Sequence, residues 1–216
     1  MQNRVRDRYP TRHERQDWEI QATALLGDSK PEILQKGGIA GYLFLSPDPQ
    51  PDRGFQSRLD GYTFSKFKPY EAWNPFQAEA KELWDIYTEI AEPVKVERIA
   101  LRTVNSLNLP LPFGDLREYI LTGPEIAPNI PSALAQFFMQ VSVPQPGGEI
   151  ATITTAMQPV QEINPSFVTV IFDIDVFVNR ILLPDSTVIW EKCEDMRQIR
   201  NDIFFNSLTE KAKGLF

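Results

Sequence analysis

The sequence predicts an α+β protein with a mainly antiparallel sheet and helices packed on one face of that sheet. Short runs of alternating apolar and polar residues are separated by stretches rich in Pro, Gly and Asp, which is typical of strands joined by hairpins. Two longer segments, near residue 74 and from about residue 187, repeat their apolar residues with helical spacing. Because hairpins dominate the order of elements, we expect antiparallel pairing with the helices on one side.

The first strands follow a polar segment. Residues 1–36 are expected to be irregular, although "QDWEIQATALL" within them fits either a short helix or a strand. The apolar run from about Ile39 to Ser46 predicts a strand, and "PDPQPDRG" after it predicts a turn. Residues 55–67 predict a second strand, antiparallel to the first.

The clearest helix begins near Asn74. Asn is a favourable N-cap, Pro75 suits the first helical position, and Gln77 stands three residues after the cap, as a capping box requires. Pro93 ends the helix because proline cannot continue it.

The second half of the chain repeats this pattern with more strands. A long strand is followed by a short helix that Asp115 caps, by a hairpin around "PQPGG", by a third strand and by a long helix. A short helix over "LTEKAKG", with Ser207 and Glu210 as a capping box, closes the chain. The expected strands are residues 94–106, 133–143, 149–157 and 166–179, and the long helix starts at about Thr187.

The expected domain organisation is simple. Residues 1–36 form the polar N-terminal segment, and residues 37–216 form a single α+β domain. That domain divides into two similar halves, at about residues 37–92 and 93–216, and the second half resembles an expanded copy of the first in its order of elements.

Composition and charge argue against several kinds of partner. The net charge of −7 argues against nucleic acid, which selects basic surfaces. No apolar run is long enough to cross a bilayer, and the first residues lack the apolar stretch of a secretory signal. We therefore expect a cytoplasmic protein whose partner is another protein or a second copy of the chain, and neither a membrane nor nucleic acid.

The rare residues exclude several chemistries. Cys193 is the only cysteine, so the chain has neither an internal disulfide nor a cysteine-based zinc site. His13 is the only histidine and lies in an arginine-rich polar stretch, which argues against a Ser-His-Asp or Cys-His pair and against a multi-histidine metal site. Cys193 also shares an apolar helix face with Ile189 and Met196, as a packed core residue would. No cofactor is expected.

Several stretches resemble an uncharacterised family of sporadically distributed bacterial proteins of unknown function. These are "FSKFKPYEAWNPFQAEAKELWDIY", "VERIALRTVNSLNLP", "FDIDV" and "FFNSLTEKAKGLF". The resemblance implies no activity, ligand or catalytic residue. The patchy distribution of the family suggests mobile defence or toxin–antitoxin loci. This chain departs from the family at its start, where members carry an apolar strand and a helix before the "RYP" region, a difference that a truncated start would explain.

Four charged residues stand on polar sides of predicted strands. Side chains alternate across a strand, so Arg98 and Arg102 share one side of their strand, as Asp173 and Asp175 do of theirs. We expect both pairs on the polar face of one sheet, opposite the apolar face under the helices. The other side chains expected on this polar face are Gln136, Gln140, Thr152 and Thr154.

Three interpretations of these four residues remain open. The arginines and aspartates can pair across strands and only stabilise the sheet. The fork-shaped donors of Arg98 and Arg102 can instead hold an anionic ligand or a protein segment. Asp173 and Asp175 can alternatively bind a divalent metal.

The three interpretations correspond to different functions. The favoured hypothesis is a non-catalytic cytoplasmic protein-interaction module that uses the polar sheet face or an open sheet edge. The alternatives are a metal-dependent phosphoryl-transfer or nucleic-acid-processing enzyme that uses Asp173 and Asp175, and a small-anion sensor that uses Arg98 and Arg102.

Overall fold

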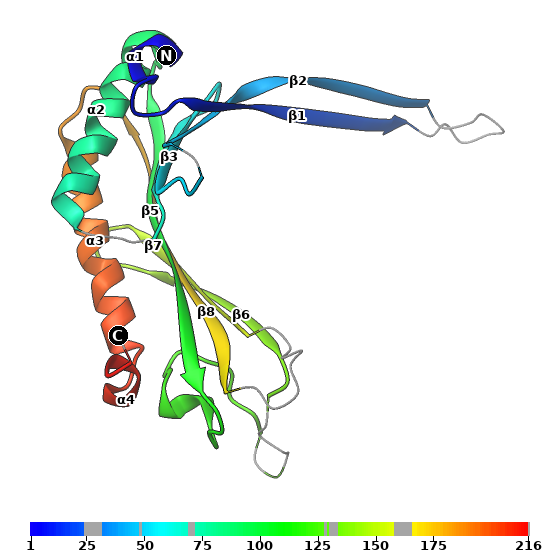
Figure 1. Ribbon diagram of the computed structural model, residues 1–216, viewed down its shortest axis with the longest axis vertical. Helices are drawn as coiled ribbons and strands as arrows, with labels where there is room; N and C mark the ends of the chain where they lie inside the picture. The colour runs from blue at the N-terminus through cyan, green and yellow to red at the C-terminus, as the bar shows by residue number, and fades with distance from the viewer. Residues whose placement is uncertain are drawn as a thin grey trace. The chain divides into compact units, whose positions relative to one another are not determined.

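The computed structural model divides the chain into two compact units, Met1–Pro93 and Val94–Phe216. It describes residues 1–23, 32–47, 49–68, 72–127, 129, 134–157 and 166–215, and the side chains of residues 17–23 and 32–36 lie outside the description. Each unit contains one four-stranded antiparallel sheet and one long helix (Figure 1). The predicted α+β class is confirmed, with two sheets where the sequence led us to expect one.

The first unit is a meander of four strands. After the short helix α1 (Gln2–Val5), the strands β1 (Thr11–Thr23), β2 (Glu32–Leu45), β3 (Arg53–Arg58) and β4 (Tyr62–Lys66) pair in chain order. Strand β1 lies inside the segment predicted to be irregular, because its polar sequence gives little sign of the long pairing that it makes with β2. Of the two alternatives left open for residues 16–26, the described part, up to Thr23, is a strand. The strand predicted over residues 55–67 is two strands, since the chain turns where Arg58 N donates to Gly61 O.

Helix α2 (Trp73–Ala91) belongs to the first unit and begins one residue before the predicted cap. Asn74 therefore lies inside the helix, and the predicted capping box is wrong. The helix ends as expected, at Ala91 before Pro93. Two of its buried side chains, Leu83 and Ile86, belong to the core cluster of the first unit, whose other buried members are Val5, Tyr9, Phe44 and Phe55.

The second unit has the strand order β5-β8-β7-β6, with the last strand of the chain at the centre. Strand β8 (Phe167–Leu182) pairs with β5 (Val96–Pro110) on one side and with β7 (Ile150–Met157) on the other. Strand β6 (Phe137–Pro144) pairs with β7 and lies at the edge of the sheet. All four strands correspond to predicted strands.

Helix α3 (Val188–Asn206) covers one face of this second sheet, over β5 and β8 (Figure 1). The residues of β8 that face α3 alternate along the strand and are buried: Val168, Val170, Phe172, Ile174, Val176 and Val178. Two small elements complete the unit. Asp115 caps a 3-10 turn over Leu116–Glu118, as predicted, whereas α4 (Glu210–Lys213) is capped by Thr209 and not by Ser207.

Candidate functional site

The structure brings the four predicted charged residues together on the face of the second sheet that points away from α3. Arg98 and Arg102 come from β5, and Asp173 and Asp175 come from the neighbouring β8. The two strands pair so that Arg102 lies opposite Asp175 and Val104 lies opposite Asp173. The ion pairs therefore run diagonally across the ladder.

Arg102 and Asp173 form the closer of the two pairs. Arg102 donates from Nε to Oδ1 and Oδ2 of Asp173 at 2.9 and 3.1 Å, and from Nη2 to Oδ2 at 2.5 Å. These hydrogen bonds raise the pKa of Arg102. The side chain of Asp173 is only 12% exposed, whereas that of Arg102 is 61% exposed. The arginine thus neutralises a carboxylate that has little contact with water.

Arg98 and Asp175 form the looser pair. Nη2 of Arg98 donates to Oδ2 of Asp175 at 3.1 Å, and both side chains are partly exposed. The guanidinium lies over the ring of Phe177, 4.5 Å from its centre. Arg98 stands opposite Asn179 in the ladder, so its side chain extends along the strand, over the Phe177 ring, to contact Asp175.

Polar side chains of β6 and β7 extend the same face. Gln140 donates to Thr154 at 2.9 Å, and Ser142 and Thr152 share a hydrogen bond of 3.2 Å. Gln136 was expected beside them but precedes β6. Within the described part of the chain, no three acidic, histidine or cysteine side chains gather as a metal site. The face therefore presents charges that neutralise each other, which favours the structural interpretation of the four residues.

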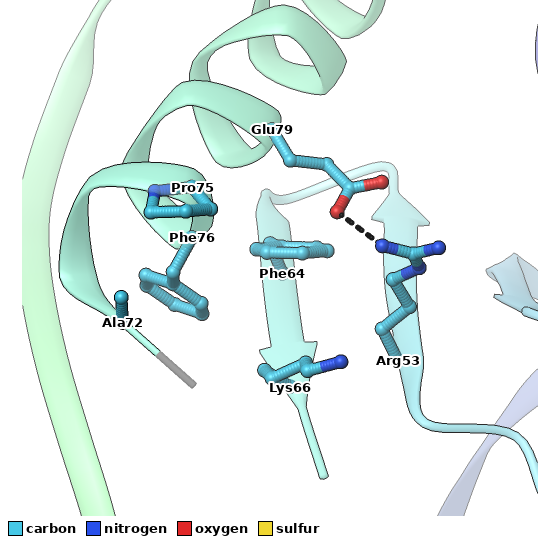
Figure 2. A pocket seen from close by; sticks show the side chains of 7 residues that line it. All are labelled: Arg53, Phe64, Lys66, Ala72, Pro75, Phe76 and Glu79. Atoms are coloured by element: carbon cyan, nitrogen blue, oxygen red, sulfur yellow. Dashed lines mark hydrogen bonds and ion pairs between the residues drawn. The ribbon is translucent and has the colours of Figure 1, made fainter. Parts of the chain in front are cut away.

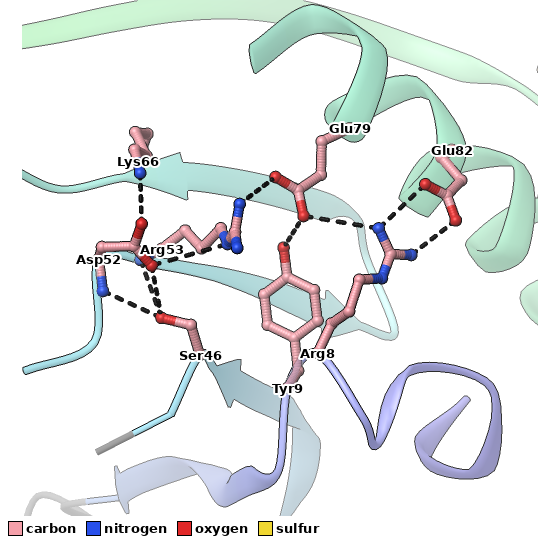
Figure 3. A network of polar contacts seen from close by, with 8 residues as sticks. All are labelled: Arg8, Tyr9, Ser46, Asp52, Arg53, Lys66, Glu79 and Glu82. Atoms are coloured by element: carbon pink, nitrogen blue, oxygen red, sulfur yellow. Dashed lines mark hydrogen bonds and ion pairs between the residues drawn. The ribbon is translucent and has the colours of Figure 1, made fainter. Parts of the chain in front are cut away.

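A second polar network lies in the first unit and has no counterpart in the sequence analysis (Figure 3). Glu79 of α2 accepts a hydrogen bond from the hydroxyl of Tyr9 at 2.8 Å and another from Arg53 at 3.1 Å. Arg8 binds Glu82 with two bonds of 3.0 and 2.6 Å. Burial and the bond to Glu79 raise the pKa of Tyr9. These contacts fix the N-terminal segment and β3 to α2.

The same network continues to the turn between β2 and β3. Lys66 donates to Asp52, and Ser46 donates to Asp52 at 2.9 Å. The bond from Lys66 lowers the pKa of Asp52. The network joins residues up to 74 positions apart, so no local pattern in the sequence could have indicated it. Its three cations, Arg8, Arg53 and Lys66, face three carboxylates, those of Asp52, Glu79 and Glu82.

Two hollows in the first unit are poor ligand sites. The smaller one, of about 50 Å³, lies between β3, β4 and the start of α2 (Figure 2). It has room for a water or two, and its charged residues Arg53, Lys66 and Glu79 are already paired. The larger one, of about 440 Å³, is an open depression whose margin includes the mostly exposed Leu59.

The edge of the second sheet at β6 differs from the other edge. Strand β5 carries Glu97, Arg98 and Arg102 and a register shift after Val96, and such features discourage pairing with another chain. Strand β6, "FFMQVSVP", has no charged residue. Pro144 at its end is the only residue of this strand that discourages pairing with another chain. Among the described strands, β7 is the only neighbour of β6. The outer edge of β6 is therefore the least protected edge of this sheet.

Comparisons with known protein families, curated proteins and solved structures find no match for this chain. The resemblance to a family of sporadically distributed bacterial proteins accordingly stays a prediction. In the described residues, no helix combines the length and the apolar character that a membrane crossing requires.

Proposed function

We propose that this protein is a non-catalytic, cytoplasmic protein-interaction module and that the outer edge of β6 is its contact surface. A strand at a sheet edge offers a row of backbone donors and acceptors to another strand. The observation that carries the proposal is the exposure of this uncharged strand. Phe138, Val141 and Val143 are 71%, 38% and 41% exposed.

The arrangement of the charged residues supports the same proposal. Each arginine already donates to a carboxylate of the neighbouring strand, Arg102 to Asp173 and Arg98 to Asp175. An anion sensor would have to separate the arginines from these carboxylates, and a metal site would have to displace the arginines. An edge that accepts a strand needs no such rearrangement.

Hydrogen exchange on the full-length protein, purified gently from its own host, tests the proposal. The complex is first identified by native mass spectrometry, and exchange is then compared between the complex and the free protein. We expect new protection of those backbone amides of Phe137–Val143 that point away from β7, because alternate amides of an edge strand face its outer side. A complex that protects other segments and leaves β6 unchanged would refute the proposal.

A matched pair of variants sharpens this test. Val141→Lys places a charge on the β6 edge, and Val104→Lys places the same charge on the β5 edge, where the valine is 57% exposed. Because a lysine on an edge strand discourages strand addition, the first variant should lose the complex and the second should keep it.

A further inference from the structure

We infer that the strand that binds the β6 edge is β6 of a second copy of this chain, paired antiparallel around a two-fold axis through Gln140. This inference rests on the proposed function and names its partner. It would join two sheets into one continuous eight-stranded sheet across the dimer, since each second unit contributes four strands.

The apolar side chains on the α3 side of the second sheet become exposed to solvent at the edge strand β6. Val141 of β6 lies beside Ile153 of β7, which lies beside Ile174 of β8. Along this row the exposed fraction rises from 0% at Ile174 to 7% at Ile153 and 38% at Val141. The exposed fraction also rises toward the edge in the neighbouring row of side chains, where Ala151 of β7 is buried and Val143 of β6 is 41% exposed. Both rows would be continued by apolar side chains on an added strand.

The sequence of β6 allows two copies of this strand to pair with apolar side chains opposite apolar side chains. Residues directly opposite in an antiparallel ladder point to the same face. With Gln140 opposite its own copy, Met139 lies opposite Val141 and Phe137 lies opposite Val143, so apolar side chains meet on the α3 side. On the other face, Phe138 lies opposite Ser142. The two apolar rows of one copy therefore continue into those of the other.

Charge and proline placement agree with this register. The chain carries a net charge of −7, yet β6 has no charged residue, so the paired strands bring no like charges together. Pro144 lacks a backbone N–H and would fall opposite Gln136, outside the strand. Seven positions, Phe137–Val143, then pair with their counterparts. Such an isologous contact closes a two-fold dimer and does not propagate into a filament.

The test measures both the assembly and its register in the full-length protein. Sedimentation velocity over a range of concentrations should show a reversible dimer. Gln140→Cys should form an intermolecular disulfide on mild oxidation, because the two copies of residue 140 stand opposite each other at about 5 Å between Cα atoms. Burial raises the pKa of the native Cys193 to about 11, so this thiol should not compete.

Ser142→Cys is the matched control on the same face of the same strand. In the inferred register, its two copies are four residues apart along the ladder, or about 13 Å, which is too far for a disulfide. Rapid cross-linking of residue 140 with none at residue 142 supports the inference. A protein that stays monomeric, or a dimer in which both variants cross-link equally, overturns it.

The proposed function can survive the failure of this inference. If the protein is a monomer and a host partner protects the amides of β6, the edge is a contact surface with a different occupant. If no complex and no dimer protects β6, both the inference and the proposed function fail.

Discussion

Replacing Arg102 should destabilise the second unit much more than replacing Arg98, although the two arginines stand four residues apart on the same strand. The reason is the burial of their partners. Asp173, whose side chain is only 12% exposed in the folded protein, would lose hydrogen bonds of 2.9, 3.1 and 2.5 Å without Arg102. Without Arg98, Asp175 loses one bond of 3.1 Å and is more accessible to water.

The magnitudes follow from the general cost of such losses. Breaking a fully buried ion pair costs about 3–5 kcal/mol, whereas an exposed pair contributes about 0.2–1 kcal/mol. Arg102 is 61% exposed, and water screens part of its interaction with Asp173. We therefore expect about 2 kcal/mol for Arg102→Met and about 0.5 kcal/mol for Arg98→Met, where methionine retains the apolar stem of each arginine.

Urea unfolding of the full-length variants, followed by circular dichroism, measures these free energies. The double variant Arg102→Met with Asp173→Asn isolates the pair, because its cost should fall clearly below the sum of the two single costs. Equal losses for Arg98→Met and Arg102→Met would refute the argument from burial.

The same variants test the two alternative functions, the small-anion sensor and the metal-dependent enzyme. A phosphate-binding or Mg²⁺-binding face would make the wild-type protein melt at a higher temperature when phosphate or Mg²⁺ is added, and Arg102→Met or Asp173→Asn would abolish that shift. Because the arginines and aspartates neutralise each other in pairs, we expect no shift for the wild-type protein with either ion.

Three further predictions concern contacts that hold each unit together. Glu149→Gln should lower the free energy of unfolding by about 3 kcal/mol in urea titrations, since Glu149 is 2% exposed and receives a 2.8 Å bond from Lys192. For Tyr9, burial and the bond to Glu79 raise the pKa, so its contribution to stability is complete below the unfolded pKa of about 10 and is lost as the pH rises toward its folded pKa. Tyr9→Phe should therefore unfold with a weaker dependence on alkaline pH, and an unchanged dependence would contradict this. Gly41→Ala should melt at a lower temperature, because the added Cβ would stand 2.4 Å from a backbone oxygen of β3.

The sequence indicated most of the second sheet because each of its strands carries a local signal. The alternation in residues 166–179 defines an apolar and a polar side, and the pairing of β8 with β5 and β7 confirms that division. Arg98, Arg102, Asp173 and Asp175 could be assigned to a common face for the same reason. Which arginine binds which aspartate depends on register, and register is a relation between strands that alternation within one strand does not contain.

The first unit was predicted less well because its order depends on contacts between distant residues. Strand β1 is polar and forms by pairing with β2, and helix α2 begins at Trp73 without the side-chain cap that Asn74 suggested. The network around Glu79 joins Tyr9, Arg53 and Arg8 across 26 to 71 positions of the chain. Periodicity reports only on neighbours along the chain, so it could not reveal this network.

The sequence by itself determined the fold class, the polar and apolar sides of the strands in the second half, and the chemistries that one cysteine and one histidine exclude. Only the tertiary structure decided that β8 lies at the centre of its sheet, that β6 lies at the edge, and that the four charges neutralise each other in pairs. The physical reason is that side-chain alternation is a property of one strand, whereas strand order and the exposure of an edge depend on which segments meet in space.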